Sequence, residues 1–262
     1  MNLRRASTVF KRNYYEMKHT PAEVFDLLYW PFFDLLAWGL LASFIESESV
    51  ELPVPIAYLI GAALLWNVFW RVQNGLSMAF LVETWTNNVI GLMASPMTPT
   101  EFIAGSLMWV LTCLAVQTAI MAILAWTVFH FGLLSLGLSL VPFFAALLLF
   151  AVAMAFLVLG VILRVGHGAN AMAWGLAGVV QPLSAVYYPM EILPGWAQVI
   201  SSAMPASHVF EAMRAVTAGE PTPWSRLWVA FGLDAVYLIA AMAFCAHMFQ
   251  TLRRRGYVTR YA

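Results

Sequence analysis

Residues 135–163 read SLGLSLVPFFAALLLFAVAMAFLVLGVIL and contain no charged side chain. A helix needs about 20 apolar residues to cross about 30 Å of hydrocarbon, so this stretch is long enough to span a membrane. The run is continuous rather than a series of short alternating segments, which argues against a membrane barrel. A helix bundle is then the remaining structure that pairs every backbone group within lipid.

The composition of the whole chain agrees with this stretch. Of its 262 residues, 62% are hydrophobic and 10% are charged. A soluble domain carries about 25% charged residues, so a soluble fold of this size would lack the charges to solvate its surface. We therefore predict an all-α polytopic membrane protein, a single transmembrane domain over 1–262 with six spans. The predicted spans are 24–45, 54–80, 101–129, 135–163, 169–188 and 224–250.

The positive charges lie mainly at the two ends of the chain. Five of the 13 Lys and Arg fall in the first 18 residues, and four of the last ten residues are Arg. Cytosolic segments carry an excess of Lys and Arg, which predicts that the N-terminus and the tail at 251–262 are both cytosolic. Apolar residues at helical spacing within 1–23 predict an amphipathic helix on the inner membrane face. A positive arm that only sets the topology is the alternative.

A polar segment at 83–100 separates the second and third predicted spans. Within it Trp85, Val89 and Leu92 recur at helical spacing, and Pro96 ends the pattern because proline cannot donate to a continuing helix. We predict a short cytosolic helix over 83–97 whose apolar face is a docking surface. Packing of that face against its own bundle is the alternative.

Three prolines punctuate the segment between the fifth and sixth predicted spans. Two short helices over 189–217 are expected there, too short to cross the membrane, which suggests a re-entrant or interfacial hairpin on the outer side. Glu211 and Arg214 stand three residues apart, where they could pair. A plain cap outside the membrane is the alternative. The residues expected to form this outer gate are Pro189, Leu193, Pro194, Trp196, Pro205, Glu211 and Arg214.

Charged side chains within the predicted spans are few. Charges at membrane depth are costly and usually face a partner or a cavity. Asp34 and Arg71 are expected at similar depths, which predicts that they face each other. Asp234 falls near the middle of the last span and is a pathway candidate, with protonation or bonding to a neighbouring helix as the alternative.

Several kinds of chemistry are excluded or unsupported. The chain has only two lysines, Lys11 and Lys18, so a GxxxxGK[ST] phosphate-binding loop is impossible. The sequence contains no HExxH, no histidine pair at metal-ligand spacing and no evident pair of catalytic carboxylates. We therefore predict no catalytic residues, no metal site, no bound cofactor and no nucleic-acid partner for this chain.

The order of its motifs resembles that of the ABC-2 type permeases, the membrane subunits of type V-like ABC exporters. The outer segment is similar in its aromatic-Pro pair, its LPxW-like run and its closing E-x-x-R. The inner segment is similar in its run from Asn88 to Pro96, followed by Glu101 and Gly105. The chain departs from the family pattern at Ser106, where a lysine is usual, and at Met204, where an asparagine is usual. The outer motifs are Tyr188-Pro189, Leu193-Pro194-Gly195-Trp196, Met204-Pro205 and Glu211-Ala212-Met213-Arg214.

The resemblance implies an ATP-driven exporter in the bacterial inner membrane. Two copies of the chain would pair within the lipid, and two separate ATPase subunits would bind ATP and Mg on the cytosolic side. The cargo would be an amphiphilic or hydrophobic drug, lipid or glycan-linked molecule. The segment 83–97 would resemble the coupling helix that contacts the ATPase. The implied coupling residues are Glu83, Trp85, Asn88, Val89, Leu92 and Pro96.

Two other functions remain open from the residues alone. A secondary transporter or channel without an ATPase would need polar groups along a path at mid-membrane depth, for which Asp234 is the candidate. A membrane enzyme acting on lipid would need a polar residue whose loss abolishes turnover, and no residue recommends itself for that role.

A charge on the predicted docking face provides a direct test. We expect Leu92→Asp to uncouple transport from ATP hydrolysis while leaving the protein folded in the membrane, because a carboxylate would disrupt an apolar contact with the ATPase. Transport and ATPase stimulation are measured in reconstituted vesicles. Unchanged transport with intact stimulation would contradict the docking role.

Overall fold

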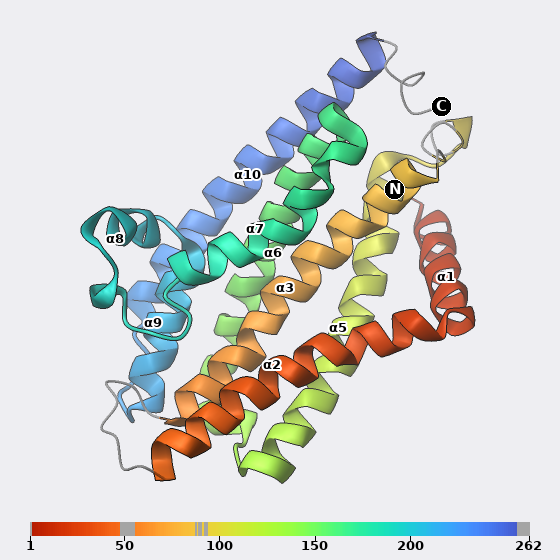
Figure 1. The fold of residues 1–262 in the computed structure, drawn as a ribbon. Helices are drawn as coiled ribbons and strands as arrows, with labels where there is room; N and C mark the ends of the chain where they lie inside the picture. The colour runs from red at the N-terminus through yellow and green to blue at the C-terminus, as the bar shows by residue number, and fades with distance from the viewer. Residues whose placement is uncertain (1, 48–55, 87, 89–90, 92–93, 256–262) are drawn as a thin grey trace.

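The computed structural model describes residues 2–47, 56–86, 88, 91 and 94–255, and all regular structure in these residues is helical (Figure 1). The predicted coupling residues Val89 and Leu92 lie outside the described residues. The helices are α1 (Leu3–His19), α2 (Pro21–Ser47), α3 (Ile56–Trp85), α5 (Pro99–Phe129), η1 (Leu133–Ser139), α6 (Leu140–Val165), η2 (Gly166–Ala169), α7 (Asn170–Leu183), η3 (Met190–Ile192), α8 (Gly195–Ser202), α9 (Pro205–Thr217) and α10 (Trp224–Arg255).

Four helical segments in the described part of the chain are long and apolar enough to cross a membrane. They correspond to the first, third, fourth and sixth predicted spans. The other two predicted spans, 54–80 and 169–188, correspond to α3 and α7. The segments that qualify by length and composition are Pro21–Ile45, Pro99–Phe129, Leu133–Val165 and Trp224–Thr251.

Helix α7 is shorter than the predicted fifth span. It has 14 residues, about 21 Å at a rise of about 1.5 Å per residue, which is less than the hydrocarbon thickness of a bilayer. The helix ends at Leu183, and Ala185 follows with φ of 50°, a left-handed conformation that cannot continue it. The residues from 184 to 188 therefore form a turn instead of extending the span.

Helix α5 shows how local sequence sets the start and end of a span. The Thr98 hydroxyl accepts from the backbone N–H of Glu101, and the Glu101 carboxylate accepts from the backbone N–H of Thr98, forming a capping box. Pro99 occupies the first helical position, where its missing N–H has no consequence. At the other end His130 adopts a left-handed conformation with φ of 53°, so the chain turns there toward η1.

The core is built around α3 and the pair α6–α10. Helix α3 contacts α2, α5, α6, α7 and α9, although it carries Asn67, Arg71, Gln73 and Asn74 in its middle turns. Those polar groups face other helices: the Asn74 amide donates to the backbone oxygen of Ala173 in α7 at 3.3 Å. Helices α6 and α10 share the most extensive contact in the bundle, with Gly160 admitting the ring of Phe244.

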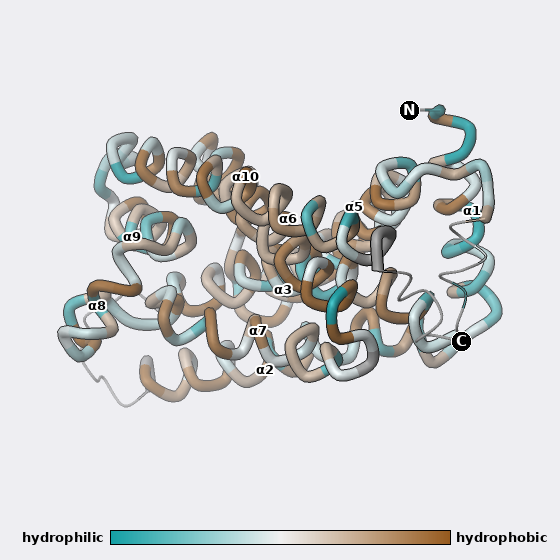
Figure 2. Tube along the Cα trace, turned by 90° about the horizontal axis from the view of Figure 1, so that it is seen from above, coloured by the Kyte–Doolittle hydropathy of each residue, from teal (hydrophilic) through white to brown (hydrophobic). Residues whose placement is uncertain are grey.

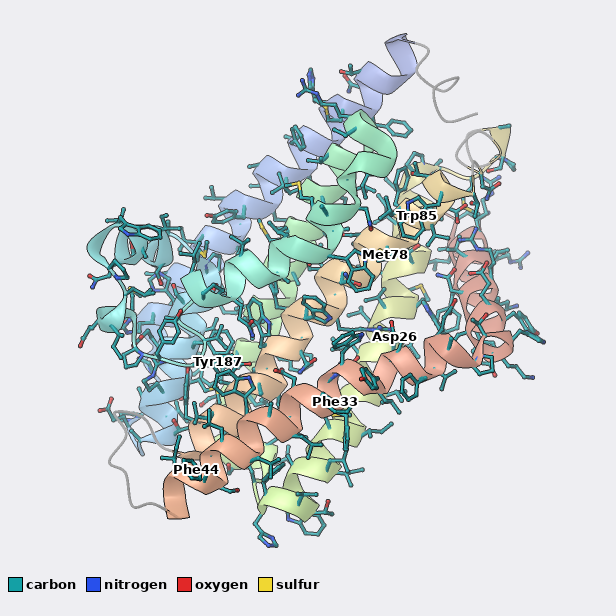
Figure 3. The ribbon with its side chains drawn as sticks, viewed as in Figure 1. Asp26, Phe33, Phe44, Met78, Trp85 and Tyr187 are labelled. Atoms are coloured by element: carbon teal, nitrogen blue, oxygen red, sulfur yellow. The ribbon has the colours of Figure 1, made fainter. Side chains whose placement is uncertain are left out.

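The short helices lie at opposite ends of this bundle. Helix α1 lies beside the junction of α3 and α5, whereas α8 and α9 lie at the far end, as both views of the chain show (Figures 1 and 2). We call these the α1 end and the α9 end. Trp85 on α3 lies toward the α1 end, and Phe44 on α2 lies toward the α9 end (Figure 3).

The space around Gly160 and Gly178 predicts opposite effects on stability when each is replaced by alanine. A Cβ atom at Gly160 would lie 2.5 Å from the Phe244 ring, so we expect Gly160→Ala to destabilise the protein by about 1–3 kcal/mol through overpacking. Gly178 in α7 has no atom within 4 Å of the equivalent position, so Gly178→Ala should be neutral or stabilising by up to about 1 kcal/mol. Thermal unfolding in detergent measures both; equal shifts would contradict this packing.

Candidate functional site

Helix α1 is held against α5 by close packing. At Gly105 a Cβ atom would collide with the backbone oxygen of Ala6 and lie 2.7 Å from Val9, so only glycine permits this approach. Ala6 and Val9 are the buried residues of α1. On the next turns the Trp109 ring makes edge contacts with Phe10 and Tyr14, with centroids 5.5 and 6.2 Å apart. The apolar side of the amphipathic helix thus covers the first three turns of α5.

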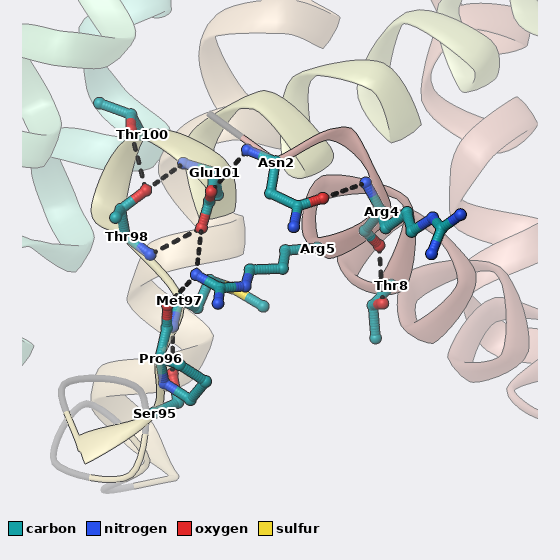
Figure 4. A network of polar contacts seen from close by, with 10 residues as sticks. All are labelled: Asn2, Arg4, Arg5, Thr8, Ser95, Pro96, Met97, Thr98, Thr100 and Glu101. Carbon is teal, nitrogen blue, oxygen red and sulfur yellow. Dashed lines mark hydrogen bonds and ion pairs between the residues drawn. The ribbon is translucent and has the colours of Figure 1, made fainter.

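A buried carboxylate at the start of α5 makes three polar contacts (Figure 4). Glu101 is 3% exposed and accepts from the backbone N–H groups of Asn2 at 2.7 Å and Thr98 at 3.0 Å. The Arg5 guanidinium lies 3.7 Å from the same carboxylate and also donates to the backbone oxygen of Pro96. One side chain of α5 therefore joins the beginning of α1 to the chain that enters α5.

A second buried carboxylate joins α1 to the end of α3. Glu83 is 3% exposed, forms an ion pair with Arg12 and accepts from the Asn88 amide at 2.6 Å. The Arg12 guanidinium also lies 5.9 Å from the centroid of the Phe102 ring, which allows a cation–π contact. We call Arg5, Arg12, Glu83 and Glu101 the clasp, because together they tie α1 to both α3 and α5.

The structure thus joins three of the predicted coupling residues to α1. Glu83 and Asn88 bond to each other, and the Pro96 backbone accepts from α1. Trp85 ends α3 and is 41% exposed, so its ring is accessible at the α1 end. Arg5 and Arg12 were not singled out from the sequence as site residues. Their spacing of seven on an amphipathic helix was the available signal, since it places both on one face.

At the α9 end a guanidinium is the centre of a second network. Nη2 of Arg214 donates to Tyr58 Oη at 2.8 Å and to the backbone oxygens of Ala185 and Tyr188 at 3.2 and 2.8 Å. Nη1 donates to Glu211 at 2.6 Å, so the predicted pairing of these two residues is observed. The Tyr58 hydroxyl in turn donates to the backbone oxygen of Val186 at 2.5 Å. This Arg214 network joins α9, α3 and the turn after α7.

The other predicted gate residues lie around this network. Glu211 also accepts from the backbone N–H of Met190, directly after Pro189, at 3.0 Å. Pro194 precedes the first turn of α8, Leu193 lies just before it, and the Trp196 ring is exposed. Pro205 opens α9 and is buried. Tyr58 was missed from the sequence, because nothing in the α3 pattern distinguishes it from other interfacial tyrosines.

The charges within the helices do not pair as predicted. Asp34 and Arg71 form no ion pair with each other; the Asp34 carboxylate interacts with Trp38 and Asn67 instead. Arg71 lies one helical turn beyond Asn67 and interacts with Cys113. The prediction counted residues from the ends of each helix, which gives depth in the membrane. It does not give the way in which α2 packs on α3, and that packing decides which side chains meet.

Asp234 forms no ion pair with any of the described residues. It is 1% exposed, and neither carboxylate oxygen has a hydrogen-bond partner among the described residues. It shares one side of α10 with Leu227, Ala230 and Ala241, which are also buried. In the described part of the chain no group of three or more His, Cys, Asp or Glu could hold a metal ion.

Apolar helices of spanning length, with short helices tied to them by buried ion pairs at both ends, define a polytopic membrane protein. A family model described as "ABC-2 type transporter" matches residues 5–217, which is most of the chain and includes the clasp and the Arg214 network. The chain belongs to this family, and it is a membrane permease component of an ABC transporter rather than an ATPase itself. Such permeases generally pair with an ATPase subunit. No curated protein matches the chain.

The Arg214 network predicts that lysine cannot replace its arginine. A lysine has three donors on one atom and cannot reach the separate acceptors of a planar guanidinium, so we expect Arg214→Lys to destabilise the protein by about 3 kcal/mol. The matched control is Arg226→Lys, because the Arg226 side chain is exposed. Thermal unfolding in detergent measures both variants, and equal stability of the two would contradict the network.

Proposed function

We propose that this chain is the transmembrane subunit of an ATP-driven exporter, which works as two copies with two separate ATPase subunits. The α1 end would face the cytosol of a bacterial cell and the α9 end its exterior, with both termini inside. The clustering of Lys and Arg at the two termini supports this orientation. In this arrangement α3, with 30 residues and about 45 Å of length, would be a fifth crossing. Helix α7 is too short to cross alone and would form the sixth crossing together with η2, which directly precedes it.

The observation that carries the proposal is the clasp. The ends of α3 and α5 flank the predicted coupling segment, and ion pairs from α1 join both of them. Because Glu83 and Glu101 are nearly inaccessible, separating them from Arg12 and Arg5 would leave buried charge uncompensated, which is strongly unfavourable. A push on the coupling segment would therefore move α1, α3 and α5 together rather than deform the loop.

ATP can drive export only if it favours one arrangement of the helices over another. Closure of the ATPase subunits would favour one arrangement of the helices only if ATP binds the two arrangements with different affinity. The Arg214 network supports an outer gate at 189–217, because it ties α9 and the turn after α7 to α3, a helix whose other end lies in the clasp. Helix α3 would then link the ATPase side to the exit.

The cargo we propose is an amphiphilic or hydrophobic molecule, a drug, lipid or glycan-linked lipid. The exposed aromatic side chains of α2 and α10 support an apolar path, among them Phe25, Phe33 and Trp228. A secondary transporter is the alternative, and the unpartnered carboxylate of Asp234 is the observation that favours it. Transport that continues after ATP depletion and follows an ion gradient would select that alternative.

The clasp predicts an uncoupled variant. We expect Arg12→Ala to reduce transport at least fivefold per ATP hydrolysed, because α1 loses its ion pair with Glu83. Lys11→Ala is the matched control: it removes one positive charge from the neighbouring exposed position and should leave the ratio unchanged. The ratio of transport to hydrolysis is measured in vesicles that contain this chain and its ATPase subunit, using a fluorescent lipid as cargo.

Two outcomes would contradict the proposal. The first is ATP hydrolysis by the purified chain without a partner. The second is an equal loss of coupling in Arg12→Ala and Lys11→Ala, which would assign the effect to general charge at the membrane surface instead of the clasp.

A further inference from the structure

Polar side chains of three helices meet in the membrane-spanning part of the bundle. The Gln117 amide of α5 donates to the Asn67 side chain of α3 at 3.4 Å, and Asn67 interacts with Asp34 of α2. One turn nearer the α1 end, Arg71 of α3 interacts with Cys113 of α5. The charge of the same guanidinium also acts on Glu23, at the start of α2, without forming an ion pair with it. We call this set of residues the polar seam.

The spacing along the helices makes the seam continuous. Asn67 and Arg71 are four residues apart on α3, and Gln117 and Cys113 are four residues apart on α5, so the two levels are stacked on the same faces. Glu23 belongs to the first turn of α2, which begins at the α1 end. The polar groups therefore lead from that end of the bundle into its interior.

Two groups in the seam lack a partner in the protein. Gln117 is 2% exposed, and its Oε1 atom accepts no hydrogen bond from the described residues. The Nε atom of Arg71 is also buried and donates to none. One is an acceptor and the other a donor, and they belong to adjacent levels of the seam. Leaving such groups unpaired in an apolar medium is unfavourable, and more so for a charged group.

We propose that the polar seam is a binding site for ordered water within the membrane-spanning bundle, reached from the α1 end. A buried water forms about three hydrogen bonds and occurs where polar groups of the protein are otherwise unsatisfied. Gln117 Oε1 and Arg71 Nε offer complementary ends for such a molecule, and Asn67 and Asp34 add further polar atoms beside them. The site does not depend on the proposed export function, since it follows from the packing of this chain alone.

The contact between α6 and α10 provides an apolar comparison for the polar seam. Gly160 lies against Phe244 and the backbone of Cys245, and the buried residues around Cys245 are apolar. The chain thus places one buried cysteine, Cys113, in the polar seam and another, Cys245, in an apolar contact. Both thiols are nearly inaccessible to bulk solvent, so they report on local water with the same chemistry.

Hydroxyl radicals made in place by a short X-ray pulse test the proposal. They arise from water and oxidise the nearest sulfur, and mass spectrometry of the intact, purified chain in lipid nanodiscs measures the oxidation rate at each cysteine. We expect Cys113 to be oxidised at least tenfold faster than Cys245. Equal protection of both cysteines would overturn the proposal.

Two variants assign the water to the seam. Gln117→Leu removes the unpaired acceptor at similar volume, and it should lower the oxidation of Cys113 at least threefold without changing that of Cys245. Thr112→Val is the matched control, since it removes a polar group from the exposed side of α5 beside Cys113 and should leave both rates unchanged. Unfolding would raise both rates and is thereby recognised. An unchanged Cys113 rate in Gln117→Leu, or an equal fall in Thr112→Val, would overturn the assignment.

Discussion

The burial of two carboxylates at the ends of α3 and α5 constrains the rest of this molecule. Glu83 and Glu101 are both 3% exposed, and burial of an ionised carboxylate is tolerated only when the charge is paired and hydrogen-bonded. The partners come from α1, which is amphipathic and has no core of its own. The position of α1, the entry of α5 and the end of α3 are therefore set together.

At the α9 end a buried charge is also paired and hydrogen-bonded, but it is positive. There the buried charge is a guanidinium, and its acceptors are a carboxylate, a phenol and backbone oxygens left free where α7 ends early. Short helices cannot bury enough apolar surface to hold a fixed position alone. Arg214 supplies the missing constraint for α9, as Arg5 and Arg12 do for α1.

Between these ends the helices are held by apolar packing, and most of α3 belongs to the same hydrophobic core. Helix α3 adds polar contacts to this packing, with side chains that face α2, α5 and α7. Packed helix interfaces favour a few discrete arrangements over continuous deformation, and hydrogen bonds across them add a preferred register. A helix with one end in the clasp and the other in the Arg214 network is well suited to carry a movement between them.

Sequence alone determined that the protein lies in a membrane, that it is helical, and in which order its long and short helices follow one another. Uncharged apolar runs of about 20 residues or more are long enough to cross lipid as helices, and the prolines at 189, 194 and 205 restrict the helices between them to a few turns. The pair Glu211–Arg214 was also predictable, because three residues on a helix bring two side chains together whatever surrounds them.

Tertiary structure alone decided which distant residues meet. The partners of Glu83, Glu101 and Arg214 lie 71, 96 and 156 residues away along the chain (Arg12, Arg5 and Tyr58), and their contacts depend on helix rotation and register. The failed pairing of Asp34 with Arg71 has the same cause: the packing of α2 on α3 places the Asp34 carboxylate beside Asn67 and Trp38 instead of Arg71. Hydropathy sets the depth of a side chain, but only packing sets the direction in which it faces.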